Sequence, residues 1–316
     1  MKKTLTLLFV LARLNMFAQT AEPNFEISTI ESSKTWLDID YVGDGIIGHK
    51  LDIFLPKKGK APFPIIVTIY GSAWFSNSAK GSCFKDGFGQ ALLNNGFAVV
   101  SINHRSSADA VWPAQLHDIK AAIRFIRANA TKFSLDSSFV GVTGFSSGGH
   151  LSTMLGVTSN LKNTKISSLN IDLEGNIGNN PNSSSHVNAV VDWFGPTNFI
   201  TMDSCGSRFK HDDIKSPESS LIGGAIQDNK DKVALANPIS YISKNTVPFL
   251  IIHGTNDKLV PYCQSQELYQ KMQQLKVSSQ FITVDAGEHG PGVMIEKYYE
   301  RMLNFFITQK KRVAKL

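Results

Sequence analysis

The chain has 316 residues, of which 42% are hydrophobic and 18% are charged, a composition typical of a globular enzyme and too apolar for a disordered chain. The first twenty residues carry a charge of +3 and the last seven carry +4, which leaves −1 of the formal +6 for the body of the chain. A basic face for binding nucleic acid is therefore not expected. The terminal charges belong to Lys2, Lys3, Arg13, Lys310, Lys311, Arg312 and Lys315.

The first twenty residues have the pattern of a secretory signal peptide. Lys2 and Lys3 precede a short apolar run over residues 5–12, and Ala18 stands near the expected cleavage point. The run is shorter than the roughly 20 residues that a membrane-spanning helix needs. A membrane anchor or a buried amino-terminal helix is the alternative interpretation.

We expect residues 1–20 to be a signal peptide and residues 21–316 to form one domain of a secreted or periplasmic protein, with no stable membrane insertion. Export permits disulfide bonds, and the three cysteines allow either one pair with a thiol left over or no pair at all. They are Cys83, Cys205 and Cys263. No Cys-x-x-Cys spacing occurs, so a zinc site is not expected.

Short apolar runs alternate with helical patterns along the body of the chain. Eight runs predict strands, at Trp36–Val42, His49–Leu55, Pro64–Tyr70, Phe97–Ile102, Phe139–Phe145, Val187–Phe194, Val247–His253 and Ser278–Val284. The clearest helix is predicted over Pro113–Ala130, where apolar residues share one stripe. Continuous Val, Ile and Leu runs are typical of parallel strands buried on both faces. The order predicts an α/β fold whose first two strands form an antiparallel pair.

Two stretches interrupt this alternation. Residues 159–186 are rich in Asn, Ser and Gly, and residues 201–217 carry several charged residues and one cysteine. Both follow predicted strands, and open α/β sheets bind ligands at the carboxyl ends of their strands. We expect the two stretches either to wall a substrate cleft or to be ordinary solvated loops.

A nucleophile is predicted at Ser146, in Gly144-Phe145-Ser146-Ser147-Gly148. This Gly-x-Ser-x-Gly pattern follows a predicted strand and opens a helical segment, which is the context of a nucleophile elbow. A side chain at position 144 or 148 is expected to collide with the neighbouring strand or helix.

A serine hydroxyl needs a base, and the base needs a carboxylate that fixes its tautomer. His253 ends its own predicted strand, where a histidine more often supports a turn, whereas His289 follows the last strand on a loop that can reach the elbow. We therefore predict that His289 is the base. The helix residues His117, Asp118 and His150 are expected to be structural.

Asp257 is predicted to be the acid, because it follows a strand at the position expected between the serine and the histidine. Asp285 lies only four residues before His289 and is expected to brace that loop instead. Asp192 and Asp203 lie one strand earlier and are weaker candidates.

The oxyanion of the reaction needs at least two fixed N–H donors. One is expected from Ser147, which follows the nucleophile, and others from the loop Tyr70-Gly71-Ser72-Ala73-Trp74, which follows the third predicted strand.

Further stretches carry a resemblance to a known family. They are Leu51–Pro56, Trp112–Ala122, the elbow through His150, Val191–Thr197, Ser216–Gly224, Asn237–Tyr241 and the loops of Asp257 and His289. From about residue 36 to residue 308 the chain resembles α/β-hydrolases of the carbohydrate-esterase type. It is most similar to the group of bifunctional feruloyl and acetyl-xylan esterases, which is related to hormone-sensitive-lipase-like esterases.

The resemblance implies an α/β-hydrolase fold, with a mostly parallel eight-stranded sheet, helices on both faces and loop insertions over the active site. It places the family's triad on Ser146, Asp257 and His289, and it implies no cofactor and no metal. The family's oxyanion loop usually reads His-Gly-Gly-x-Trp, and here Ser72 replaces the second glycine. The N–H groups of Ser72 and Ala73 remain available as donors, and the serine hydroxyl is expected either to add a donor or to restrict the acyl pocket. A positive φ at position 72 would strain serine.

Tyr70 replaces the histidine of that family loop. His104-Arg105 stands where such enzymes commonly have Tyr-Arg. The His104-Arg105 departure predicts a different pocket floor, and the changes together are expected to affect the acyl preference more than the chemistry.

The expected function is hydrolysis of acetyl or feruloyl esters on plant polysaccharide through an acyl-enzyme. Trp74, Trp112 and Trp193 are candidate substrate contacts, although each is more often a core residue. The alternatives are a lipase-like short-chain esterase, an arylformamidase or a peptidase of the same fold, and a non-catalytic binding protein. The oligomeric state stays open, and a frayed, solvated terminus is expected for residues 310–315.

Overall fold

The structure is a computed structural model that describes residues 29–315. The predicted signal peptide therefore lies outside the described residues. A sheet of eight strands forms the centre, and all eight predicted strands are confirmed. Its order across the sheet is β1 (Lys34–Asp40), β2 (Lys50–Leu55), β4 (Ala98–Ile102), β3 (Phe63–Ile69), β5 (Leu135–Phe145), β8 (Ala189–Trp193), β9 (Phe249–Gly254) and β10 (Ser279–Val284).

The sheet is mostly parallel. Strand β2 pairs antiparallel with both β1 and β4, and the remaining neighbours are parallel. Strands β3, β4 and β8 are buried along their whole length, as expected for strands covered on both faces. Because parallel strands end at one edge, the loops that follow β3, β5, β8, β9 and β10 meet there.

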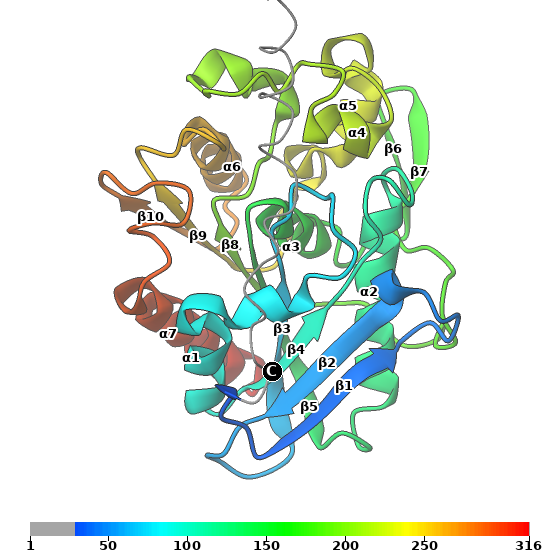
Figure 1. The fold of residues 1–316 in the computed structure, drawn as a ribbon, viewed down its shortest axis with the longest axis vertical. Helices are drawn as coiled ribbons and strands as arrows, with labels where there is room; N and C mark the ends of the chain where they lie inside the picture. The colour runs from blue at the N-terminus through cyan, green and yellow to red at the C-terminus, as the bar shows by residue number, and fades with distance from the viewer. Residues whose placement is uncertain (1–28, 316) are drawn as a thin grey trace, which may run out of the picture.

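Helices cover both faces of the sheet (Figure 1). One face packs against α1 (Phe88–Asn94) and α7 (Glu296–Val313), through a core that includes Phe88, Leu92, Met302 and Phe306. The other face packs against α2 (Ala114–Ala128), α3 (Ser147–Val157) and α6 (Cys263–Gln274). The short helices α4 (Pro217–Ile222) and α5 (Lys230–Ala236) join this second core. The architecture is that of an α/β-hydrolase.

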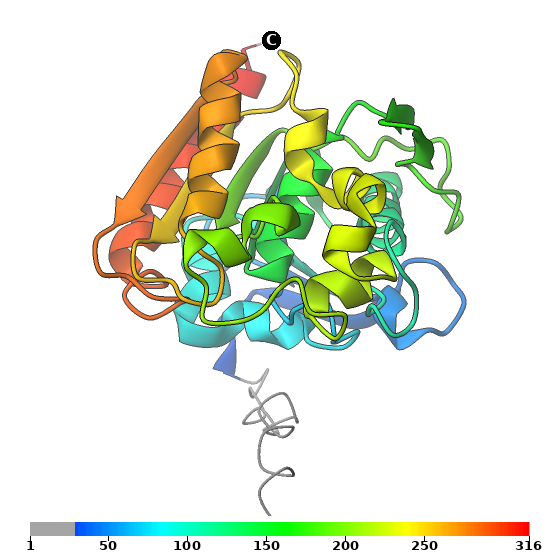
Figure 2. The same cartoon turned by 90° about the horizontal axis from the view of Figure 1, so that it is seen from above.

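The first irregular stretch, residues 159–186, contains an unpredicted hairpin of β6 (Asn163–Ile166) and β7 (Leu169–Asp172). It stands apart from the main sheet (Figure 2). Glu174, just after the hairpin, forms ion pairs with Lys120 and Arg124 of α2. The stretch follows the far end of α3, so it lies along α2 and not over the elbow.

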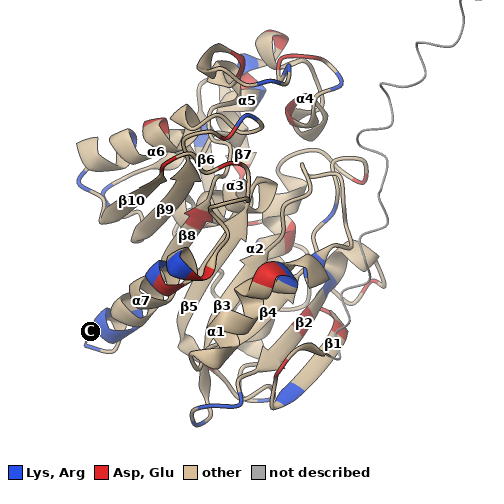
Figure 3. Cartoon of the chain, turned by 60° about the vertical axis from the view of Figure 1, so that its left-hand side comes forward, with Lys and Arg blue, Asp and Glu red and all other residues tan. Residues whose placement is uncertain are grey.

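The basic carboxyl terminus is not a frayed tail. Lys310, Lys311 and Arg312 form the last turn of α7 (Figure 3), where cations interact favourably with the helix dipole. Within residues 29–315, no helix is both long and apolar enough to span a bilayer.

Candidate active site

Ser146 occupies a sharp turn between β5 and α3. Its φ of +56° is rare for a residue with a side chain, and its N–H donates to the Trp193 carbonyl of β8 at 2.9 Å. A Cβ at position 148 would lie 2.2 Å from the carbonyl oxygen of Ile69, and one at position 144 would lie 2.4 Å from the carbonyl oxygen of residue 148. The expected collisions at both glycines are confirmed, so this turn can form only with glycine at each position.

Asp257 and His289 are hydrogen-bonded to each other. Nδ1 of His289 lies 2.7 Å from Oδ2 of Asp257, and the Asp257 side chain is fully buried. Oδ1 of the same carboxylate accepts the N–H groups of Leu259 and Val260, each at 2.9 Å. The carboxylate is thereby fixed on both oxygens, and it holds the proton of His289 on Nδ1, which leaves Nε2 free to act as a base.

Backbone contacts hold the two loops together. The N–H of Thr255 donates to the Val284 carbonyl and that of Asn256 to the Gly287 carbonyl, each at 2.9 Å. Gly254 lies so close to Gly287 that an added Cβ would be 2.2 Å from its carbonyl oxygen. Asp257 therefore comes to His289 as part of a rigid pair of loops.

A second histidine touches the same carboxylate. Nε2 of His253 lies 3.2 Å from Oδ2 of Asp257 and 3.0 Å from the Val260 carbonyl, while its Nδ1 lies 2.7 Å from the Ser265 hydroxyl. A carbonyl only accepts, so Nε2 carries the proton and donates to both oxygens. The sequence interpretation of His253 as a turn residue missed this contact. The signal that could have found it is the short separation of four residues between His253 and Asp257.

Burial alone would raise the pKa of the Asp257 carboxyl, but the hydrogen bonds from His253 and His289 outweigh it and hold that pKa well below its usual range. The carboxylate is therefore charged at any pH at which His289 is neutral, as a triad acid must be.

Residues at the end of β8 contact both the elbow and His289. Ser146 is bonded to Trp193, and the ring of the next residue, Phe194, meets the His289 ring with centroids 4.7 Å apart. Within the described part of the chain, the Ser146 hydroxyl forms no hydrogen bond, including none to His289; such contacts often tighten only when substrate binds.

The other candidate acids have different roles. Asp285 is exposed, and Asp203 accepts the N–H groups of His211 and Asp212 and so shapes its own loop. The helix residues are structural, as expected. Asp118 binds Arg105 and His49, His117 contacts the Asp172 carbonyl, and His150 contacts the Ala236 carbonyl.

The predicted oxyanion loop adopts left-handed backbone at Ala73 (φ +51°) and Trp74 (φ +59°), not at Ser72. The strain considered for Ser72 is therefore absent there. The Ser72 N–H donates to the Ser147 hydroxyl at 2.9 Å, whereas the Ala73 N–H has no protein partner among residues 29–315. The Ser147 N–H belongs to the first turn of α3, where helices leave N–H groups unpaired. Two of the three predicted donors are thus unengaged.

Tyr70 and His104 form a buried stack under this loop. Their ring centroids are 4.9 Å apart and nearly parallel, and the Tyr70 hydroxyl donates to the Ser76 carbonyl at 2.9 Å. Neither residue lines the cavity described next. The expectation that His104 alters the pocket floor is therefore wrong. His104 instead packs against Tyr70, the first residue of the oxyanion loop.

A cavity of about 310 Å³ opens onto Ser146. Its lining comes from the oxyanion loop, the elbow, the loop after β9 and the second irregular stretch with the start of α4. The residues are Ala73, Trp74, Ser146, Ser147, Pro196, Phe209, Lys210, His211, Asp213, Lys215, Ser216, Pro217, Glu218, Leu259 and Val260. Of the two irregular stretches, residues 201–217 wall the cavity and residues 159–186 do not.

Of the three candidate tryptophans, Trp74 lines this cavity. Nε1 of Trp112 donates to the Leu235 carbonyl at 2.9 Å, and Nε1 of Trp193 donates to the Thr143 hydroxyl at 3.1 Å. Trp193 has no exposed surface and packs among the aromatic rings on the α1 and α7 face. The interpretation of Trp112 and Trp193 as substrate contacts is therefore wrong.

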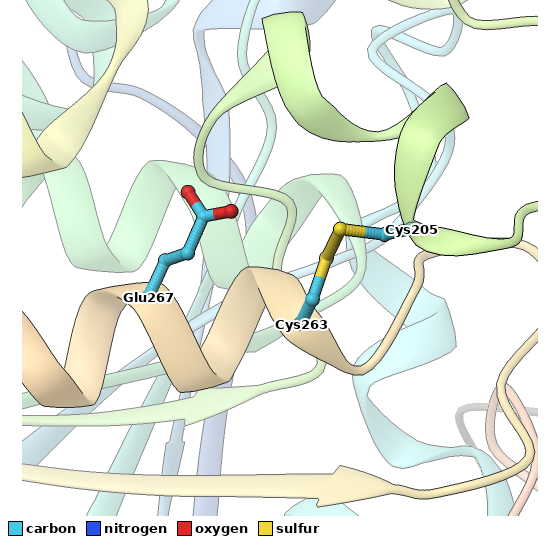
Figure 4. A group of neighbouring side chains, drawn as sticks. All are labelled: Cys205, Cys263 and Glu267. Carbon is cyan, nitrogen blue, oxygen red and sulfur yellow. A yellow bond between two sulfur atoms is a disulfide. The ribbon is translucent and has the colours of Figure 1, made fainter.

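A disulfide joins Cys205 to Cys263 and leaves Cys83 as a buried thiol. It links the cavity-lining stretch to the first residue of α6, just after the Asp257 loop (Figure 4). Glu267 lies beside it. Because the two sulfurs are bonded to each other, they offer no thiolate ligands to a metal. The disulfide fixes one wall of the cavity to the loop that carries the acid.

Asp192 is a buried carboxyl that braces the turn after β8. Its Oδ1 accepts the Gly195 N–H at 3.1 Å and leaves no room for a side chain at Gly149, where a Cβ would lie 2.4 Å away. Oδ2 has no hydrogen-bond partner in the described part of the chain. Burial raises the pKa of Asp192 to about 7, although the bond from Gly195 acts in the opposite direction.

We predict that Asp192→Asn changes how stability depends on pH. The folded protein keeps the Asp192 proton up to about pH 7, whereas the unfolded chain loses it near pH 3.8. Stability present at low pH is therefore lost as the pH rises through this window, by roughly 4 kcal/mol. The variant does not ionise at this position. The difference between its free energy of unfolding and that of the unmodified protein should therefore shift in favour of the variant by about that amount between pH 4 and pH 8. Urea unfolding measures both proteins, and a constant difference would contradict the raised pKa.

The sequence matches the BD-FAE family over residues 51–272. Among curated proteins it is 27% identical to "Esterase LipC" of Mycobacterium tuberculosis over 241 residues, which are 72% of this chain and 53% of the relative. The "Probable carboxylic ester hydrolase LipM" of the same organism is also 27% identical, over 75% of this chain and 52% of the relative. The chain thus spans about half the length of these curated relatives.

Two solved structures are more similar in sequence. One is titled "Truncated form of carbohydrate esterase from gut microbiota"; it is 45% identical, with a TM-score of 0.85, over 89% of this chain and 97% of its own. The other is a "Bifunctional GH43-CE" from Bacteroides eggerthii; it is 48% identical, with a TM-score of 0.83, over 87% of this chain and 35% of its own.

Proposed function

The chain belongs to the BD-FAE family of α/β-hydrolases, and on that premise we propose that it is an exported serine esterase that removes acetyl or feruloyl groups from plant polysaccharides. One observation carries the proposed chemistry: the unengaged hydroxyl of Ser146 faces a cavity next to the hydrogen-bonded pair of Asp257 and His289. A nucleophile, an oriented base and a buried charged acid are the parts that acyl transfer through serine requires.

In the first half of the proposed reaction, Nε2 of His289 takes the proton of the Ser146 hydroxyl as its oxygen bonds to the ester carbonyl carbon. The carbonyl electrons move to the oxygen, which accepts hydrogen bonds from the N–H groups of Ala73 and Ser147. The Ser72 N–H supports this hole by holding the Ser147 hydroxyl. The intermediate then collapses, the bond to the alcohol breaks, and His289 gives its proton to the leaving oxygen.

In the second half, His289 takes a proton from water, and the hydroxide attacks the acyl carbon bound to Ser146. The same two N–H groups donate hydrogen bonds to the second oxyanion. Collapse breaks the bond to the Ser146 oxygen, which regains the proton from His289 and releases the carboxylic acid. Each half needs His289 in its neutral form, because only a neutral imidazole can accept the proton.

The substrate class rests on the relatives. One similar solved structure is named as a carbohydrate esterase, at 45% identity, and the other as a bifunctional GH43-CE protein, at 48% identity. The body of the chain carries a formal charge close to zero, which suits an uncharged sugar ester. A lipase-like short-chain esterase, or an arylformamidase or peptidase of the same fold, has the same machinery. A non-catalytic binding protein is disfavoured because the serine, the acid and the histidine are all present.

A substrate panel tests the proposal. Acetylated xylan, methyl ferulate, nitrophenyl acetate and an aryl formamide are assayed side by side with the purified protein and its Ser146→Ala variant. We expect hydrolysis of the carbohydrate or feruloyl ester by the first and none above background by the second. Activity confined to the amide would contradict the esterase assignment, and activity confined to the nitrophenyl ester would favour the short-chain esterase.

The exported location is part of the same proposal. It is supported by the signal-like pattern of residues 1–20 and by the disulfide between Cys205 and Cys263, since disulfides persist in oxidising compartments. The amino-terminal sequence of the protein recovered outside the cytoplasm should begin near residue 19. A full-length protein retained in the cytoplasm would contradict export.

A further inference from the structure

A buried ion pair forms part of the cavity wall beside Ser146. Glu218, in the first turn of α4, and His211, in the preceding loop, both line the cavity and are each more than nine-tenths buried. Nδ1 of His211 lies 3.1 Å from Oε1 of Glu218. The proposed reaction uses neither residue.

The contacts of His211 determine its charge. Its Nε2 lies 2.9 Å from the Ser207 hydroxyl and 3.1 Å from the Leu259 carbonyl. The carbonyl only accepts and the hydroxyl is able to accept, so both contacts are favourable when Nε2 carries a proton. Nδ1 then needs a second proton to make its contact with Glu218 favourable. Burial alone would lower the pKa of His211, but Glu218 raises it above its ordinary value. Glu218 therefore favours the protonated form of His211, and its Oε1 faces Nδ1 without the alignment of a hydrogen bond.

The other carboxylate oxygen has nothing to bind. Oε2 of Glu218 is buried with no hydrogen-bond partner in the described part of the chain, and so is Nε1 of Trp74 in the same cavity. The remaining wall is largely apolar, with Phe209, Leu259 and Val260 among its residues. A buried polar group that has no hydrogen-bond partner destabilises the folded protein. With Nδ1 of His211, three such atoms belong to residues that line this cavity, which indicates that a ligand completes them.

The chemistry of these groups specifies the ligand. A carboxylate oxygen only accepts a hydrogen bond, and an indole N–H only donates one. A neutral hydroxyl group does both, whereas an alkyl chain does neither. The group that complements this acceptor and this donor together is therefore a hydroxyl.

We propose that Glu218 and Trp74 form a hydroxyl-recognition subsite next to Ser146, which selects esters that carry a neutral hydroxyl group. This inference rests on the proposed esterase function and narrows its substrates. His211 is a positioning residue that holds the Glu218 carboxylate in place. The hydroxyl belongs either to a sugar in the alcohol part or to a phenol in the acyl part, and matched substrate pairs separate these sources.

The test uses two pairs of esters that differ in one hydroxyl. The first pair is a monoacetylated methyl xyloside and its deoxy analogue, and the second is methyl ferulate and the methoxycinnamate ester that lacks the phenolic hydroxyl. The measured quantity is the ratio of kcat/KM within each pair. We expect the unmodified protein to favour the hydroxyl-bearing member of at least one pair by ten- to a hundredfold.

Trp74→Phe removes the indole donor, and Glu218→Gln replaces the charged acceptor by a neutral one. Each should lower that ratio about tenfold, because one hydrogen bond of about 1.4 kcal/mol is lost or weakened. Trp112→Phe is the matched control, since its indole is bound to the Leu235 carbonyl away from the cavity, and it should leave the ratio unchanged. Equal losses on both members of a pair would show a merely structural role and overturn the subsite.

A binding measurement separates this inference from the esterase function. Calorimetric titration of the Ser146→Ala protein with the same four esters should show tighter binding of the hydroxyl-bearing member. Hydrolysis with a ratio near one and no difference in binding would refute the subsite and leave the esterase intact. Selective binding without hydrolysis by the unmodified protein would refute the esterase and leave the subsite.

Discussion

Ser146→Ala should lower kcat for every hydrolysed ester by at least about 10⁴-fold, because removing a triad nucleophile leaves only binding and oxyanion stabilisation. KM should change little, since the hydroxyl makes no hydrogen bond to any of residues 29–315 that its removal would break. Steady-state kinetics on nitrophenyl acetate measure both constants. The structure gives no reason for a loss of stability, because the turn already accommodates a side chain at φ +56°.

Ser152→Ala is the matched control for this variant. Ser152 lies on the same helix, α3, and is fully buried, with a hydroxyl that has no hydrogen-bond partner among the described residues. We expect its kcat to stay within a few-fold of the unmodified value. Residual activity of Ser146→Ala near that of the control would mean that another group is the nucleophile.

Asp257→Asn should lower kcat by about 10⁴-fold without unfolding the protein. An asparagine oxygen still accepts the N–H groups of Leu259 and Val260, but the amide N–H₂ then faces His289 and His253, which both donate to this position now. His289 is thereby driven to the tautomer with its proton on Nε2, which is unable to accept the serine proton. The measurement is kcat over a pH series, because the defect should persist at high pH, where the imidazole is neutral.

Asp285→Asn serves as the comparison. Asp285 is exposed and lies four residues before His289, so it tests whether any acid near this histidine is sufficient. We expect a change of less than threefold. A larger loss of kcat for Asp285→Asn than for Asp257→Asn would mean that Asp285 is the acid and would contradict the assignment.

The depressed pKa of Asp257 also affects stability. Its carboxylate is bonded in the folded protein, so its stabilising contribution is present above the ordinary pKa of about 3.9 for an aspartate. That contribution is lost as the pH falls through the lower folded value. Asp192 has the opposite dependence, because burial raises its pKa. Ionisation of Asp257 therefore stabilises the folded protein above about pH 4, whereas ionisation of Asp192 destabilises it as the pH rises toward 7.

The strands and the elbow were predictable because their causes are local. Continuous apolar runs of five to seven residues indicate strands buried on both faces, and Gly144 and Gly148 are needed at one tight turn. The order of Ser146, Asp257 and His289 along the chain follows from the fold, because each comes after a strand that ends at the same edge of the sheet. The three residues were therefore predicted from the Gly-x-Ser-x-Gly pattern and from their positions after these strands.

The missed features depend on contacts between distant segments. The second contact of His253 with Asp257 requires the loop after β9 to fold back on its strand. The ion pair of His211 and Glu218 requires residues 201–217 to close over Ser146. The burial of Trp193 against α7 and α1 likewise reflects the side of the sheet to which it points. A single sequence carries no signal for such contacts beyond the residue types.

The most direct test of the central claim, that Ser146 forms an acyl-enzyme, is intact-protein mass spectrometry after rapid mixing with nitrophenyl acetate and acid quenching, followed by peptide mapping. We expect one acetyl group per chain, located on Ser146, and an organophosphonate that labels the same residue and stops hydrolysis. Hydrolysis that continues at full rate while Ser146 stays unmodified, or acylation at another residue, would contradict the claim.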